Sequence, residues 1–223
     1  MIQRFLVWVL SIAKRWLDDS VAEEELRAFV CDRLHQLVKS VNAGKISQDE
    51  PVVQGIFKAA ERLRVLRISW LPQFDQLSIS HDPHFEALSA STDENCPPVV
   101  HQGIIAAGAA DHLLAELKSD EPVPAWQMEQ MEALLRHIEI RRQAGLRFQP
   151  SLSEDERWIE IQKTSLLFTR YAQQQQDYRF LNTALKLNDW TYKYYRNTPL
   201  TPRLLHYLQA VLEAEATLLE MTA

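Results

Sequence analysis

The sequence predicts an all-α protein, an irregular multi-helix bundle of about eight helices with no β-sheet. Apolar residues recur at helical spacing along most of the chain, which is the pattern of amphipathic helices. Glycine is scarce, with 5 residues in 223, and sheets joined by tight turns usually need more of it. The hydrophobic share of 46% and the charged share of 24% are normal for a globular protein, so we expect a packed core.

Signals at helix ends divide the chain into these helices. Ser20 with Glu23, and Ser47 with Glu50, have the spacing of capping boxes, whose side chains bind free amides at a helix start. Gly44 follows a helical pattern, as a C-terminal cap does. The predicted helices cover about residues 1–17, 20–44, 47–70, 98–118, 125–144, 154–173, 176–196 and 201 to near the C-terminus.

Residues 176–195, QDYRFLNTALKLNDWTYKYY, are the most informative stretch of the chain. At 3.6 residues per turn its polar residues gather on one narrow stripe, and large apolar side chains cover the rest. The stripe consists of Arg179, Asn182, Lys186, Asp189 and Lys193. A helix that is apolar around most of its circumference is usually central to a bundle, so we expect the last two helices to be central.

The segment 166–189 resembles a single tetratricopeptide unit. The matching residues are Phe168, Leu181, Ala184 and Leu185. No second copy occurs one period away, and stacked repeats need several units to be stable. We therefore interpret the segment as a helical hairpin and assign no family.

Residues 71–97 interrupt the helical pattern. They are polar and rich in serine, with no sustained period. A long irregular connection in a compact domain is usually functional or disordered. We expect an N-terminal helical subdomain over 1–70, an irregular connecting segment over 71–97 and a C-terminal helical bundle over 98–223, or one continuous domain that includes all three.

Charge and cysteine content narrow the classes of partner. The net charge of −6 argues against a nucleic-acid-binding protein, because neutralising phosphates requires a basic surface. The two cysteines, Cys31 and Cys96, have neither metal-binding nor redox spacing. A cytoplasmic location is the simplest expectation.

Residues 1–17 are the exception to the acidic balance, since they contain three bases and no acid. Their apolar run is too short for a membrane-spanning helix, which needs about 20 apolar residues. A cationic, Trp-bearing amphipathic helix can lie in a membrane interface, so peripheral membrane association is one interpretation. Packing as the first core helix is favoured, because most amphipathic helices of globular proteins face a core.

Two groups of residues have the chemistry of a metal or acid–base site. His81, His84 and Glu86 would place three donors within one turn of the connecting segment, and His112 and Glu116 are four residues apart on a predicted helix. Imidazoles and carboxylates are ligands of zinc and iron. A divalent metal is the secondary hypothesis. The favoured one is a solvated loop and a local His112–Glu116 pair, with no cofactor.

Asn188 falls within the apolar arc of the 176–195 helix. A buried amide without partners costs about 1–3 kcal/mol, so its side chain must be satisfied. We expect hydrogen bonds to a neighbouring helix. The alternative is a ligand site formed by Asn182, Lys186, Asn188 and Asp189.

The sequence contains none of the common enzyme motifs: no dinucleotide fingerprint, phosphate-binding loop, nucleophile elbow or zinc-protease helix. With a large apolar inventory that includes six Trp, this favours a non-enzymatic interaction or accessory protein. Its partner would be a protein, or a second copy in a homodimer, bound through helical surfaces. The alternative is a metal-dependent or small-ligand-binding helical enzyme, with its site near the 81–86 loop, His112 and Glu116.

Overall fold

The computed structural model describes residues 25–65, 98–117, 122–142 and 144–222. The predicted helix at 1–17, the Ser20–Glu23 capping box and the connecting segment 71–97 lie outside these residues. Helices cover residues 25–42, α2 (Pro51–Val65), α3 (Ala109–Ala115), α4 (Ala125–Arg141), α5 (Glu154–Gln175), α6 (Tyr178–Tyr195) and α7 (Pro202–Thr222).

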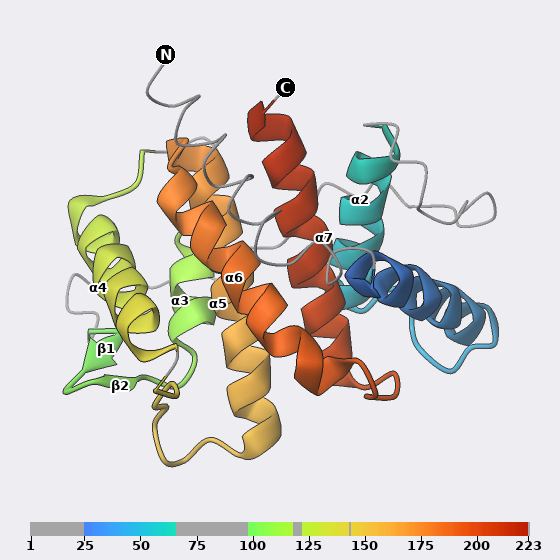
Figure 1. Ribbon diagram of the computed structural model, residues 1–223, viewed down its shortest axis with the longest axis horizontal. Helices are drawn as coiled ribbons and strands as arrows, with labels where there is room; N and C mark the ends of the chain where they lie inside the picture. Colours follow the sequence, from blue (N-terminus) through green and yellow to red (C-terminus); the bar gives the residue numbers. More distant parts are fainter. Residues whose placement is uncertain (1–24, 66–97, 118–121, 143, 223) are drawn as a thin grey trace.

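The described part of the chain is mostly helical, as predicted, and holds seven helices where the sequence predicted about eight. It also contains a small antiparallel sheet, so the prediction of no β-sheet is wrong (Figure 1). Strand β1 (Val100–His101) pairs with β2 (Ile104–Ile105). The predicted helix over 98–118 is reduced to the seven residues of α3.

The physical reason is the backbone conformation at two turns. Gln102 and Gly103 have φ angles of 50° and 73°, and Gly108 has a φ of 71°. An α-helix requires φ near −63°, so a helix cannot pass through these positions. Two consecutive residues with positive φ form the turn that suits a two-residue β-hairpin. The predicted helix over 98–118 had included all of these positions.

The helix ends follow the sequence signals in part. Gly44 has a φ of 67°, as expected of a residue that ends a helix. The Ser47–Glu50 capping box is not formed, because Ser47 Oγ accepts from the Asp49 amide and α2 begins only at Pro51. A capping box formed by Ser153 and Glu156, which was not predicted, starts α5.

Helices α5, α6 and α7 form the middle of the molecule. Helix α4 and the β-hairpin lie on one side of them, and α2 with the 25–42 helix lies on the other (Figure 1). Helices α5 and α6 are joined by a short turn at Gln176, whose φ is 54°, and they form the predicted helical hairpin. Every residue from Tyr207 to Ala214 of α7 is buried. Because eight consecutive residues pass around a helix more than twice, α7 is covered on all sides.

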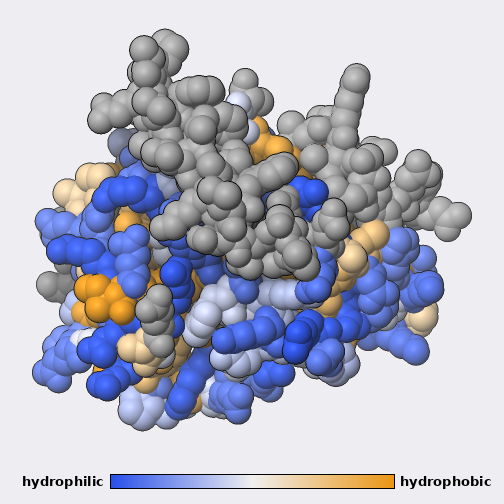
Figure 2. Space-filling model, viewed as in Figure 1, coloured by the Kyte–Doolittle hydropathy of each residue, from blue (hydrophilic) through white to orange (hydrophobic). Residues whose placement is uncertain are grey.

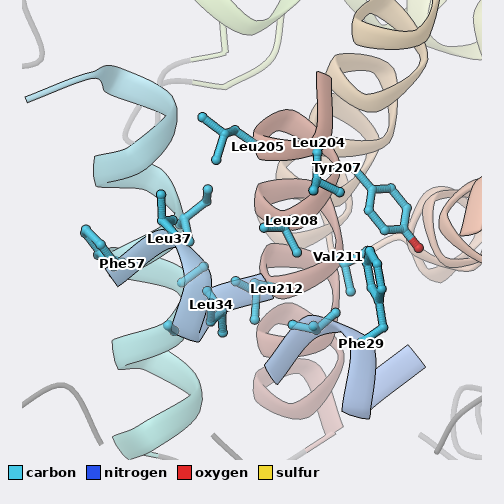
Figure 3. Close-up of a cluster of buried hydrophobic side chains, with 14 of the residues drawn as sticks. Phe29, Leu34, Leu37, Phe57, Leu204, Leu205, Tyr207, Leu208, Val211 and Leu212 are labelled. Atoms are coloured by element: carbon cyan, nitrogen blue, oxygen red, sulfur yellow. The ribbon is translucent and has the colours of Figure 1, made fainter. Parts of the chain in front are cut away.

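Two hydrophobic cores lie on either side of α7. The first is formed by the 25–42 helix, α2 and α7, and Figure 3 shows Leu34 and Leu37 in the space between α2 and α7, toward Leu208 and Leu212. The second core is formed by the β-hairpin, α3, α4, α5 and α6, and it includes Ala214 of α7. Helix α7 is therefore the wall that the two cores share.

Helices α2 and α7 approach each other closely, and ion pairs also connect them. A Cβ atom at Gly55 would lie 2.1 Å from Gln209 Nε2, so only glycine fits there while Gln209 keeps its place. Arg62 of α2 binds both Glu213 and Glu220 of α7, the latter at 2.6 Å. Since Glu213 is buried, its negative charge needs a cationic partner such as Arg62.

Candidate functional site

Three aromatic side chains form a partly exposed cluster where α5 begins and α6 ends. Both of these helix ends lie in the lower half of Figure 1. The ring centroid of Trp158 lies 4.6 Å from that of Tyr194 and 6.3 Å from that of Trp190. Tyr194 is 46% exposed, and both tryptophans are half-buried. We call Trp158, Trp190 and Tyr194 the aromatic surface.

The antiparallel packing of α5 and α6 in the helical hairpin explains why these rings meet. Trp190 and Tyr194 are four residues apart and share one face of α6. Trp158 stands in the second turn of α5, and the hairpin places this turn beside the end of α6. The sequence did not predict this cluster, because the third ring comes from a different helix.

The aromatic surface rests on a rigid base. Trp158 lies 6.0 Å from the buried Tyr195, whose ring stacks on that of Tyr207 at 4.4 Å. Burial raises the pKa of Tyr195 to about 12, so its hydroxyl stays neutral. The exposed rings are thus the outer layer of an aromatic stack that continues into the core.

Charged residues surround the aromatic surface. Asp155 forms an ion pair with Arg203 at 3.0 Å, and Glu156 accepts from the Ser153 amide at 2.7 Å in the capping box of α5. Lys193 Nζ lies 5.0 Å from the centroid of the Tyr194 ring, within the range of a cation–π contact. Figure 2 shows that the visible face of the described residues is largely hydrophilic, with small separate apolar areas.

A second cluster, of titratable side chains, joins α3, α5 and α7. The buried Glu160 accepts from the Ala110 amide at 2.9 Å, and burial raises the pKa of this carboxyl. Lys163 pairs with Asp111 at 2.5 Å. Burial lowers the pKa of His206 to about 4.

This titratable cluster has a structural explanation. Gly108 has no side chain to cap α3, so Glu160 supplies the acceptor for a free amide at its first turn. The Lys163–Asp111 pair ties the same turn to α5. Within the described ranges, no group of three His, Cys, Asp or Glu side chains is arranged to hold a metal ion.

Only some of the residues predicted for a metal site lie within the described ranges. His81, His84 and Glu86 lie outside the described residues. His112 is exposed on α3, with its ring 6.2 Å from that of Trp126, and Glu116 is the C-cap of the same helix. The two side chains are on neighbouring turns, and the metal hypothesis remains a prediction.

The predicted ligand residues of α6 occupy different environments. Asn182, Lys186 and Asp189 are half-buried along the polar stripe. Asn188 is 2% exposed, its Oδ1 accepts from Ser165 Oγ at 2.8 Å and its Nδ2 donates to the Ala210 carbonyl at 3.3 Å. The amide thus ties α6 to both α5 and α7, as the structural interpretation of Asn188 expected.

Comparison with known proteins assigns no family, because no family model, no curated protein and no solved structure matches the chain. None of the helices in the described residues is long and apolar enough to cross a membrane.

Replacing Asn188 tests its structural role. Asn188→Leu should cost no more than about 1–2 kcal/mol, because Ser165 Oγ keeps its bond to the Ala184 carbonyl at 3.2 Å. Asn188→Asp should cost more, because it places a charge between three helices. Urea unfolding at neutral pH measures both. Equal stability of the two variants would show that the side chain is not buried.

His206 should make stability depend on pH. Its pKa is about 4 in the fold, against an ordinary value of 6.5, so the fold favours the neutral imidazole. Its contribution is complete above pH 6.5 and is lost as the pH falls toward 4, because the unfolded chain then binds the extra proton. Between pH 7.5 and 4.5 the loss should be roughly 2 kcal/mol.

The measurement is urea unfolding of the wild type and of His206→Gln at both pH values. The variant should lose less stability on acidification than the wild type does. An identical loss in both proteins would show that the His206 imidazole is solvated.

Proposed function

We propose that the protein is a non-enzymatic interaction protein that binds a protein partner through the aromatic surface. The observation that supports this is the partial exposure of three neighbouring rings, Trp158, Trp190 and Tyr194, where α5 begins and α6 ends. Trp and Tyr are enriched in the buried centres of protein interfaces and supply much of the binding free energy there.

The arrangement of the rings also favours binding. Each ring is held by its neighbours and by the stack of Tyr195 on Tyr207, so a partner would not have to order it. Immobilising a free side chain on binding costs about 0.5–1.5 kcal/mol, and a preformed cluster avoids most of this cost. Lys193 beside the rings would give a partner's acidic group a contact that fixes its orientation.

The bonds of the titratable cluster support the non-enzymatic proposal over the enzyme alternative. Glu160 accepts a hydrogen bond from an α3 amide, and Lys163 pairs with Asp111. Both interactions hold α3 to α5, so these side chains have a structural role. The metal-dependent alternative keeps His81, His84, Glu86, His112 and Glu116 as donors. Stoichiometric zinc or iron in the purified protein, measured by elemental analysis, would contradict our proposal and support the metal-dependent alternative.

Two further parts of the proposal rest on the sequence. We place the protein in the cytoplasm because its two cysteines do not suggest a disulfide scaffold, and we expect no nucleic-acid partner because the chain is acidic. Peripheral membrane contact through residues 1–17 is the alternative. Flotation with liposomes, with and without this segment, distinguishes it.

Site-specific photocrosslinking in cells tests the proposed function. A benzophenone amino acid at position 194 should give discrete protein adducts, because a bound partner covers this position. The same amino acid at the exposed position 139 of α4 is the matched control and should give none of these adducts. Identical adduct patterns at the two positions, or no adduct at 194, would contradict the proposal. Mass spectrometry then identifies the adduct as a different protein or a second copy.

A further inference from the structure

We infer that the partner of the aromatic surface is a second copy of this chain, packed about a two-fold axis so that Glu154 of each copy faces Lys193 of the other. The inference rests on the proposed function, because it names the occupant of the same surface. It is drawn from the charges that the fold leaves without a partner at this end of the molecule.

Glu154 and Lys193 are exposed, and neither forms an ion pair within the part of the chain that the structure describes. The neighbouring charges differ from them in this respect. Asp155 is paired with Arg203, and Glu156 is engaged by Ser153 in the capping box. Arg157 also forms no ion pair there, and its Nε donates to the Leu152 carbonyl. Glu154 and Lys193 are thus an acid and a base beside the aromatic surface whose charged groups have neither an ion pair nor a hydrogen bond within the described residues.

The rings of the aromatic surface lie between these two charges. Glu154 precedes Trp158 by one turn on the same face of α5. The Trp158 ring contacts that of Tyr194 at 4.6 Å, and Lys193 Nζ lies 5.0 Å from the Tyr194 ring centroid. The order across the surface is therefore an acid, two rings and a base.

A surface with this order is complementary to itself. A two-fold axis through the rings places ring against ring and brings the acid of each copy to the base of the other. Closed dimers with such isologous interfaces are the commonest assemblies of soluble proteins. A partner of uniform charge would attract one of the two groups and repel the other, which disfavours it.

The size of the surface sets the strength of the dimer. A standard interface buries about 800 Å² on each partner, and three partly exposed rings with two charges supply less than this. We therefore expect reversible dimers with a Kd in the micromolar range or above. Because the charge pairs would lie at the rim of the rings, added salt should weaken the dimer.

Charge reversal tests the pairing directly. Lys193→Glu gives each copy acids at both positions, and Glu154→Lys gives each copy bases at both. Each variant alone would place like charges opposite one another across the two-fold axis. A 1:1 mixture of the two variants would place an acid opposite a base at both contacts.

Sedimentation velocity from about 1 to 100 μM at low salt is the measurement. The wild type should dimerise, each variant alone should dimerise at least tenfold more weakly, and the mixture should regain dimers. Glu139→Lys, which reverses an exposed acid on α4, should dimerise like the wild type. Unchanged urea unfolding of each variant would confirm that it is folded.

A monomeric wild type over this range would overturn the inference, as would a mixture no more dimeric than its components. The proposed function is judged separately, by the crosslinks at position 194. Adducts with a different protein, together with a monomeric wild type, would retain the proposed function and reject the second copy. The absence of both adducts and dimers would reject the two together.

Discussion

The middle of helix α7, from Tyr207 to Ala214, is buried around its whole circumference, and α7 contributes side chains to both hydrophobic cores. On one side it covers the 25–42 helix and α2, and on the other it reaches the core of α4, α5 and α6. A helix in this position can carry polar side chains only where partners are provided. Glu213 has Arg62 and Arg170 as those partners, and Gln209 fills the space left by Gly55. The geometry of α2 therefore depends on α7.

The same helix fixes the hairpin that carries the aromatic surface. Asn188 of α6 donates to the Ala210 carbonyl of α7, and Tyr207 of α7 donates to the Asn188 carbonyl at 3.2 Å. Reciprocal bonds of this kind set the register of two helices, because a shift by one residue would break both. The stack of Tyr195 on Tyr207 then places the end of α6, with its exposed rings, beside the start of α5.

Much of the fold could be predicted from periodicity within one segment. The apolar pattern located α5, α6 and α7, and it placed Asn188 in the core. The β-hairpin was missed because a helix was predicted over 98–118, whereas the positive φ of Gly103 makes a turn within that range. The aromatic surface was missed for a different reason. Periodicity describes one helix at a time, and Trp158 joins Tyr194 only through the packing of two helices. The role of Glu160 as the cap of α3 also depends on contacts distant in sequence.

The central claim, that α7 is the wall shared by both cores, is tested most directly by native-state hydrogen exchange. Amides that open only when the whole protein unfolds exchange slowest, and they mark the elements on which all others depend. The account predicts that the amides of α7 exchange slowest of all, at a rate set by the global free energy of unfolding. Those of α4 and the β-hairpin should exchange faster. The account would be contradicted if α7 exchanged faster than α4, or if the core on one side of α7 stayed protected while α7 exchanged.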